Sequence, residues 1–120
     1  MPLDHPEART AAASALANTL LAHFAAAGYP RCEPPILQPA SVFLDLSGED
    51  IRHRLFLASD ASGAEHCLRP EFTIPISRVY LASAGAGRPA GYSYCGPIFR
   101  YRPNASGEFA QAGVESFGRK

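Results

Sequence analysis

Apolar residues recur at helical spacing near the start of the chain. Large apolar side chains follow one another at i, i+4 intervals, and smaller ones fill the adjacent row: Leu16, Leu20 and Phe24, with Ala13, Ala17 and Leu21. Pro6 suits a first helical turn, Asp4 is a candidate cap before it, and Gly28 is a suitable terminator. The pattern predicts a core or interface helix over residues 6–27.

Short extended runs and turns follow this helix. Residues 29–37 carry three prolines, which cannot donate to a strand ladder, so we expect an edge or interface strand there. Residues 39–54 are expected to form a loop with a short helix and a turn at 47–50. Residues 55–58 and 65–68 flank a Gly-containing turn and are expected to pair as a hairpin.

A second helix is predicted over residues 73–84. Thr73 can cap its N-terminus, and Pro75 suits its first turn. The small residues of 85–91 indicate a surface loop after the helix.

The last third of the chain has the most informative pattern. Residues 92–101 are rich in aromatic and β-branched residues, 103–107 form a turn sequence, and 109–117 resume an extended pattern. Alternation in the second run places Gln111 and Glu115 on one sheet face. Such polar groups between apolar strands need a partner. The residues therefore favour a site for a small, amine-bearing cation.

Length and charge limit the classes of function. With 120 residues the chain is one domain at most. Its eleven basic and eleven acidic side chains give a formal net charge of zero. Because a basic nucleic-acid footprint is absent from this balance, we do not expect tRNA binding.

The cysteines and histidines give no sign of a metal or disulfide site. The three cysteines are far apart without a Cys-x-x-Cys pair, which favours reduced thiols in the cytoplasm. No signal peptide or membrane span is expected. Residues 116–120 come directly after a predicted strand, so we expect a single domain truncated from a longer protein.

Two segments carry a family resemblance, LRPEFTIP at residues 68–75 and GPIFRYR with GEFAQAGVESFG across residues 96–118. Together they resemble the catalytic core of class II aminoacyl-tRNA synthetases. The likeness is closest to the histidyl-tRNA synthetase branch, and within it to the synthetase-like regulatory subunits of ATP phosphoribosyltransferase. The resemblance implies an α+β fold: an antiparallel β-sheet with flanking helices on one face, as in the first half of a class II synthetase catalytic domain.

The same resemblance implies which residues contact a ligand. Glu71 and Thr73 match family positions that contact the α-amino group of histidine, and Gln111 and Glu115 match positions that complete the amino-acid pocket. Arg100 matches the arginine that holds the α-phosphate of ATP and the substrate carboxylate in active synthetases. The acceptors suit an ammonium, and a guanidinium suits an oxyanion. We expect these five residues to bind histidine, with no catalytic residue, metal or cofactor.

The chain departs from active synthetases in the turn after Arg100. In those enzymes the turn is longer and carries a glutamate and a second arginine that clamp ATP. Here Gln111 follows Arg100 by only eleven positions, and Gly107 stands in place of that arginine. A transferring phosphate group would therefore be poorly neutralised. The amino-acid half of the site is kept, and the ATP half is eroded.

Structural roles compete with ligand binding for these residues. Glu71 and Glu115 could form ion pairs with nearby arginines: Arg69, Arg78 or Arg100. Gln111 could be solvated, and Thr73 could be a simple helix cap. For Tyr92 and Tyr94 we expect packing in the sheet core.

The function implied by the resemblance is regulatory. The whole protein would sense histidine and inhibit a short-form ATP phosphoribosyltransferase catalytic subunit, the first step of histidine biosynthesis, as a homodimer within a hetero-oligomer. The alternative is an active histidyl-tRNA synthetase, which adenylates histidine and charges tRNA. A third possibility is a structural subunit that keeps the pocket without using it.

Overall fold

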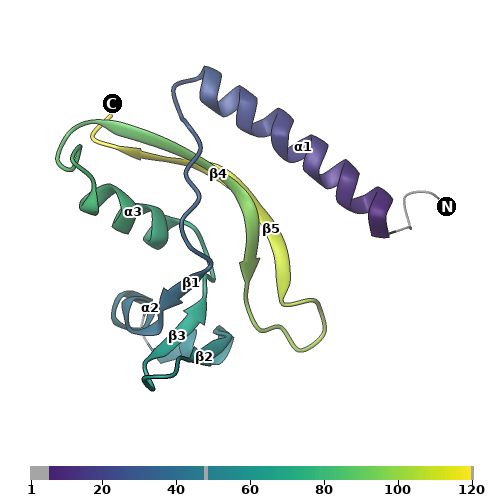
Figure 1. Ribbon diagram of the computed structural model, residues 1–120, viewed down its shortest axis with the longest axis vertical. Helices are drawn as coiled ribbons and strands as arrows, with labels where there is room; N and C mark the ends of the chain where they lie inside the picture. Colours follow the sequence, from purple (N-terminus) through teal and green to yellow (C-terminus); the bar gives the residue numbers. More distant parts are fainter. Residues whose placement is uncertain (1–5, 48, 120) are drawn as a thin grey trace.

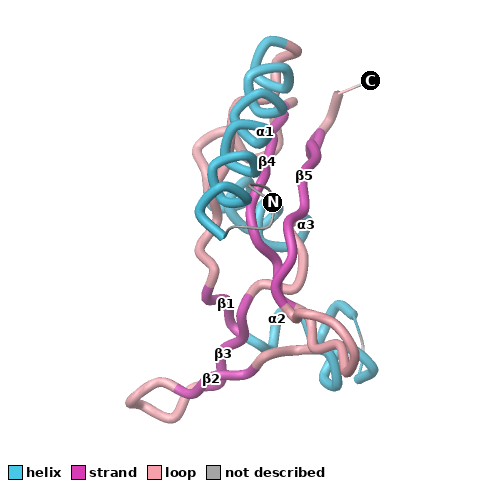
Figure 2. Tube along the Cα trace, turned by 90° about the vertical axis from the view of Figure 1, so that its right-hand side faces the viewer, coloured by secondary structure: helices cyan, strands magenta, loops and turns pink. Residues whose placement is uncertain are grey.

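The computed structural model describes residues 6–47 and 49–119, arranged around a long two-stranded hairpin and a small second sheet (Figures 1 and 2). The elements in chain order are α1 (Pro6–Ala26), β1 (Leu37–Pro39), α2 (Ala40–Ser47), the 3-10 helix η2 (Glu49–Arg54), β2 (Leu57–Ser59), β3 (Glu65–Leu68), α3 (Thr73–Ala82), β4 (Ala90–Phe99) and β5 (Glu108–Phe117). The predicted helices and hairpins are confirmed. Asp4 and Gly48, assigned to a cap and a turn, lie outside the described residues.

Strands β4 and β5 pair antiparallel over ten residues each and form the long hairpin. Tyr92 lies opposite Glu115, and Tyr94 lies opposite Gly113. Along β5 half-buried residues alternate strictly with exposed ones. Gln111 and Glu115 both belong to the half-buried set, so their predicted common face is confirmed.

Helix α3 packs on that half-buried face of the hairpin. Phe72 and Ile76 join Tyr94 and Ile98 in one buried cluster. Farther along, the ring of Tyr80 stacks on Phe117 at 4.3 Å between centroids. Aromatic packing therefore fixes both ends of α3 against the hairpin.

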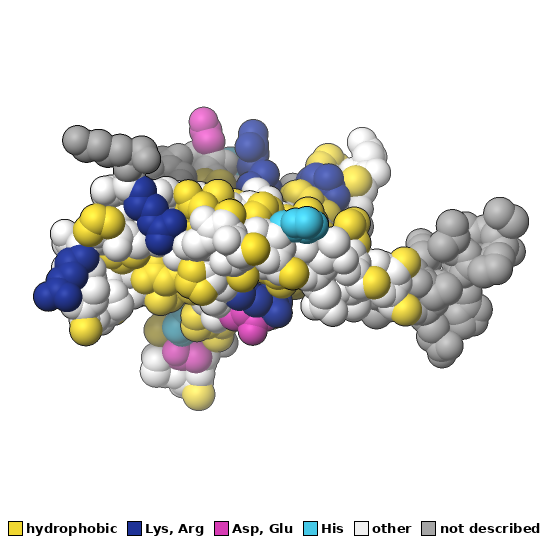
Figure 3. Space-filling model, turned by 90° about the horizontal axis from the view of Figure 1, so that it is seen from above, with side chains coloured by type: hydrophobic (Ala, Val, Ile, Leu, Met, Phe, Trp, Pro, Cys, Tyr) yellow, Lys and Arg dark blue, Asp and Glu magenta, His cyan; other side chains and the backbone are white. Residues whose placement is uncertain are grey.

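Helix α1 covers the opposite face of the same hairpin, as Figure 1 shows. Its Ala17 borders the same hollow as Cys95 and Ala110, which alternate with the residues facing α3. The expectation that all helices lie on one face is therefore wrong. The apolar residues of α1 surround the helix, so their spacing could not say which sheet face it covers. Leu16 remains 62% exposed, and apolar side chains are spread over this upper surface in Figure 3.

Residues 29–36 run alongside β4 but are not a regular strand. Cys32 donates its amide to Ser93 O at 2.8 Å, and Ser93 donates its amide to Pro30 O at 2.8 Å. The three prolines of this segment cannot extend the ladder, so the predicted strand is limited to β1, Leu37–Pro39.

The second sheet has the strand order β1-β3-β2, with both pairs antiparallel. It packs against α2 around a buried cluster of apolar side chains: Ala40, Phe43, Leu55 and Cys67. Ile74, in the first turn of α3, contacts this cluster from the side. The N-terminus of α3 is therefore held between the two cores.

Arg69 connects the segments that surround this helix terminus. The side chain is only 6% exposed, and its Nε donates to Pro97 O at 2.9 Å while Nη1 donates to Pro34 O at 2.8 Å. Its guanidinium lies 4.4 Å from the centre of the Phe72 ring. One buried cation therefore joins the segment before β1, the strand β4 and the start of α3.

The elements are spread rather than tightly gathered. The radius of gyration is 16.2 Å, whereas a compact domain of this length has about 14 Å. Within the described part of the chain no helix is long and apolar enough to cross a membrane.

Replacing Arg69 with methionine should destabilise the intact protein by about 2–4 kcal/mol, because the carbonyls of Pro34 and Pro97 lose their buried donor. Denaturant unfolding measures this change. Arg88→Met, at an exposed position, is the matched control and should change stability by less than about 0.5 kcal/mol. Equal stability of the two variants would contradict the role given to Arg69.

Candidate functional site

Two acidic side chains meet at the N-terminus of α3. The hydroxyl of Thr73, the first residue of the helix, donates a 2.7 Å hydrogen bond to Oε1 of Glu115 on β5. Glu71 lies two residues before Thr73 and directs its carboxylate at the same helix end. The structure therefore brings Glu71 and Thr73, which are close in sequence, together with Glu115, which lies 42 positions after Thr73.

Glu71, and not Thr73, caps α3. The Thr73 amide donates to Oε2 of Glu71 at 2.5 Å, and the Ile74 amide donates to Oε1 at 2.9 Å. The N-cap residue is Phe72, whose side chain has no polar atom to offer. The prediction that Thr73 caps the helix is wrong, because Thr73 is already the first helical residue and the Glu71 side chain reaches forward to the free amides. This leaves the Thr73 hydroxyl available to Glu115.

The phenol hydroxyl of Tyr94 is a further polar group near the carboxylates of Glu71 and Glu115. Its ring stacks on Phe72 at 4.5 Å, which confirms the expected core packing. Burial raises the pKa of the Tyr94 phenol, and the nearby charges of Glu115 and Glu71 raise it further. Sequence reasoning missed this hydroxyl as part of the site. Its signal is the absence of a side chain at Gly113, directly opposite in the register.

Arg100 and Gln111 lie on the same face of the hairpin, closer to its turn. Arg100 donates from Nε to Pro70 O at 2.7 Å, and its guanidinium lies 5.8 Å from the Phe109 ring centre. Gln111 is half-buried, and its side-chain amide makes no hydrogen bond to another described residue. These two predicted residues therefore flank the acidic cluster without joining its hydrogen bonds.

The ion-pair alternative for the two carboxylates does not match the geometry. Arg69 is bound to backbone carbonyls, Arg78 donates to Oε1 of Gln38 at 3.2 Å, and Arg100 donates to Pro70 O. Across residues 6–47 and 49–119, none of the three forms an ion pair with Glu71 or Glu115. The acidic cluster therefore lacks an internal counter-ion of the expected kind, and a bound cation could supply it.

The turn between β4 and β5 is closed by its own contacts. Arg102 donates from Nε to Ser106 O at 2.9 Å and lies 4.2 Å from the Phe109 ring centre. A Cβ on Gly107 would come within 2.6 Å of the Phe56 ring. A side chain at position 107 would therefore require the Phe56 ring to shift, and Arg102 is already bound within the turn.

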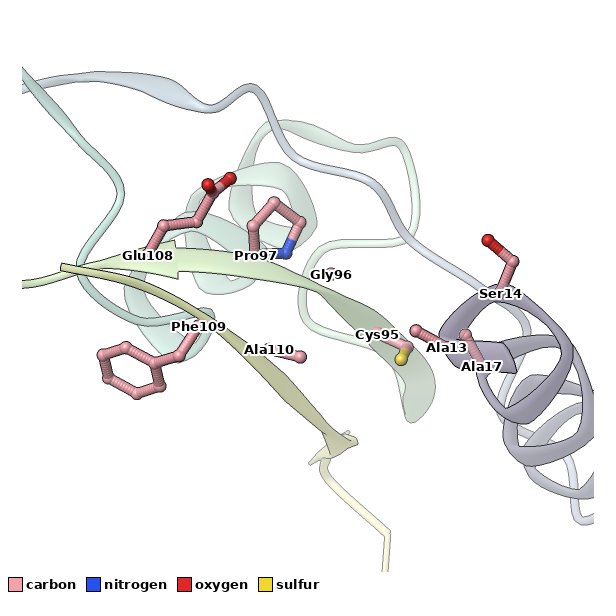
Figure 4. A pocket seen from close by; sticks show the side chains of 9 residues that line it. All are labelled: Ala13, Ser14, Ala17, Cys95, Gly96, Pro97, Glu108, Phe109 and Ala110. Atoms are coloured by element: carbon pink, nitrogen blue, oxygen red, sulfur yellow. The ribbon is translucent and has the colours of Figure 1, made fainter. Parts of the chain in front are cut away.

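A hollow of about 560 Å³ lies on the opposite face of the hairpin, between α1 and β4–β5. Figure 4 shows Ala13 and Ala17 of α1 beside Cys95 of β4 at its border. Its lining is mostly small and apolar, so it offers few groups to orient a polar ligand. The acidic cluster on the α3 side has the more specific chemistry.

Residues 3–120 match the family model described as histidyl-tRNA synthetase. The chain belongs to the histidyl-tRNA synthetase family. Within this family, an ATP phosphoribosyltransferase regulatory subunit of Rhizobium rhizogenes is 50% identical over 102 residues, covering 85% of this chain and 27% of the relative. The subunit of the same description from Agrobacterium fabrum is 44% identical over 98% of this chain and 29% of its own length.

Solved structures of the family agree with the fold. A structure from Bacillus halodurans, described as an ATP phosphoribosyltransferase regulatory subunit/histidyl-tRNA synthetase, has a TM-score of 0.80 at 27% identity and covers 97% of this chain and 30% of its own. A histidine–tRNA ligase subunit from Alicyclobacillus acidocaldarius has a TM-score of 0.77 at 24% identity, over 97% of this chain and 33% of its own, and supports the fold alone. The chain thus spans under a third of the curated relatives described above.

Replacing Glu71 with alanine should destabilise the intact protein by about 1 kcal/mol, because the amides of Thr73 and Ile74 lose their acceptor. Glu71→Gln keeps an acceptor oxygen and should recover most of this loss in thermal unfolding. Glu108→Ala, at an exposed position on β5, is the control. A Glu71→Ala variant as stable as Glu108→Ala would show that Glu71 does not cap α3.

Proposed function

We propose that this chain forms the histidine-contacting part of a regulatory subunit of ATP phosphoribosyltransferase. The observation that carries the proposal is the contrast on the hairpin. The acidic cluster of Glu71, Thr73 and Glu115 is assembled, whereas the turn beside it is closed by Arg102 and by the contact of Gly107 with Phe56. The names of the Rhizobium and Agrobacterium relatives support the same function.

The acidic cluster suits the ammonium of histidine. The Thr73 hydroxyl donates to Glu115, which leaves its oxygen lone pairs free to accept from an ammonium. The second carboxylate oxygen of Glu115 accepts no hydrogen bond from another described residue, and the carboxylate of Glu71 can accept beyond its two backbone amides. The ligand would thus meet acceptors that the protein already holds in place.

The other polar groups on this face suit the rest of the ligand. Arg100 uses Nε to bind Pro70 O, and its terminal nitrogens can turn to the α-carboxylate of histidine. The side-chain amide of Gln111, which has no hydrogen-bond partner among the described residues, lies between Arg100 and the acidic cluster along the hairpin and can donate or accept. A zwitterion therefore matches the face better than a simple cation does.

The same contrast disfavours an active ligase. Adenylation requires cations that neutralise the α-phosphate as it is attacked, and this electrostatic contribution is usually the largest one in catalysis. Near the turn, Arg102 is bound to Ser106 O, and position 107 is a glycine packed against the Phe56 ring. The chain itself would catalyse no reaction, and a short-form catalytic subunit would transfer the phosphoribosyl group.

Regulation follows from differential affinity. If histidine binds more tightly to the inhibited arrangement of the hetero-oligomer, it shifts the population towards that arrangement. We infer a homodimer of regulatory subunits within this assembly. The three cysteines are all free thiols, which supports a cytoplasmic location.

Thr73→Val and Glu115→Gln should each weaken histidine binding to the intact protein about tenfold or more, because each removes a hydrogen bond to a charged group. Isothermal titration calorimetry measures the change. Thr19→Val is the matched control, since its hydroxyl only bonds Ala15 O within α1. Unchanged affinity in both site variants would place the histidine site elsewhere.

Two activity measurements separate the regulatory function from the ligase. Mixed with a short-form catalytic subunit, the intact protein should give transferase activity that histidine inhibits. On its own it should give no histidine-dependent exchange of pyrophosphate into ATP. Exchange activity would instead favour the synthetase, and transferase activity insensitive to histidine would favour a purely structural subunit.

A further inference from the structure

The hydroxyl of Tyr94 occupies space that exists only because residue 113 is glycine. Tyr94 and Gly113 are paired in the register of β4 and β5, and both belong to the face covered by α3. A Cβ built on Gly113 would lie 2.6 Å from the Tyr94 hydroxyl oxygen. The tyrosine therefore extends across its own strand and ends directly over β5.

Packing fixes the ring in this position. Tyr94 is only 9% exposed, and its ring stacks on Phe72 with an angle of 23° between the planes. Phe72 in turn lies beneath the buried guanidinium of Arg69. The Phe72 ring holds the Tyr94 ring from one side, and β5 supports its end. Displacing the hydroxyl would therefore cost the packing energy of the whole ring.

The hydroxyl faces the acidic cluster. Glu115 is two residues beyond Gly113 on the same strand, which places its Cβ about 7 Å along the same face. Both Glu115 and Glu71 act on the phenol electrostatically, and with burial they keep it in its neutral, hydrogen-bearing form. The hydroxyl makes no hydrogen bond to any residue among those the structure describes. Among the described residues only the Ser93 hydroxyl is a buried side-chain polar atom without a partner, so the Tyr94 hydroxyl reaches solvent and is open to a ligand.

We propose that Tyr94 is a further ligand-contacting residue, whose hydroxyl accepts a hydrogen bond from the ligand's ammonium and whose place Gly113 keeps open. The proposal rests on the proposed histidine site and adds a residue to it. The phenol proton is then free to be donated to a carboxylate, so ligand, phenol and carboxylate form a continuous chain of donors and acceptors. Tyr94 also ties recognition to the core, since its ring is part of the stack that holds α3.

The test is histidine binding by the intact protein with Tyr94→Phe, measured by calorimetry. Phenylalanine keeps the stack on Phe72 and removes only the oxygen. We expect about ten- to a hundredfold weaker binding with little change in melting temperature. Histidinol, which keeps the amine and lacks the carboxylate, should lose affinity by a similar factor, because the contact is to the amine.

Tyr80→Phe is the control. Tyr80 is equally buried, and its hydroxyl donates to Arg88 O at 2.7 Å and accepts from the Gly87 amide at 2.8 Å, so this variant should lower the melting temperature and leave histidine affinity unchanged. If the wild-type protein and the Tyr94→Phe variant bind histidine with equal affinity, the role of Tyr94 is overturned and the site itself is not. Histidine affinity that falls while histidinol affinity does not would also overturn the role of Tyr94. Absence of histidine binding by the wild-type protein would overturn the site itself.

Discussion

The arrangement of this chain depends on one buried cation. Arg69 reaches the carbonyls of Pro34 and Pro97 and covers the ring of Phe72, so three segments distant in sequence meet at its guanidinium. A charge in such a place is costly unless hydrogen bonds satisfy it, and here two carbonyls do so. Phe72 in turn stacks on Tyr94. Its neighbours in sequence, Glu71 and Thr73, are thereby held beside the hairpin, where Thr73 donates to Glu115. The geometry of the candidate site therefore follows from the packing beneath it.

Local patterns predict the elements well and their assembly poorly. Helix α1, helix α3 and the β4–β5 hairpin are all predicted by the sequence, and Pro or Gly marks several of their ends. The sheet face of Gln111 and Glu115 follows from alternation alone. The face that α1 covers does not, because alanines surround the helix. The cap on α3 was also mispredicted, since the competition between Glu71 and Thr73 for the first amides is decided by side-chain reach.

The part of the hairpin beside α3 and its turn differ in their chemistry. On the side of α3, the carboxylates of Glu71 and Glu115 lie near the Thr73 hydroxyl and the Tyr94 phenol. Within the described chain these groups have no cationic partner. At the turn, Gly107 packs against Phe56 and Arg102 donates to Ser106 O. The proposed function therefore keeps recognition of an amino acid and leaves out its activation.

The most direct measurement is a crystal structure of the intact protein grown with histidine. The account predicts that the α-amino nitrogen lies about 3 Å from the Thr73 hydroxyl and a Glu115 oxygen, with the Arg100 side of the hairpin facing the carboxylate. Histidine bound elsewhere on the protein, with the acidic cluster unchanged, would contradict it.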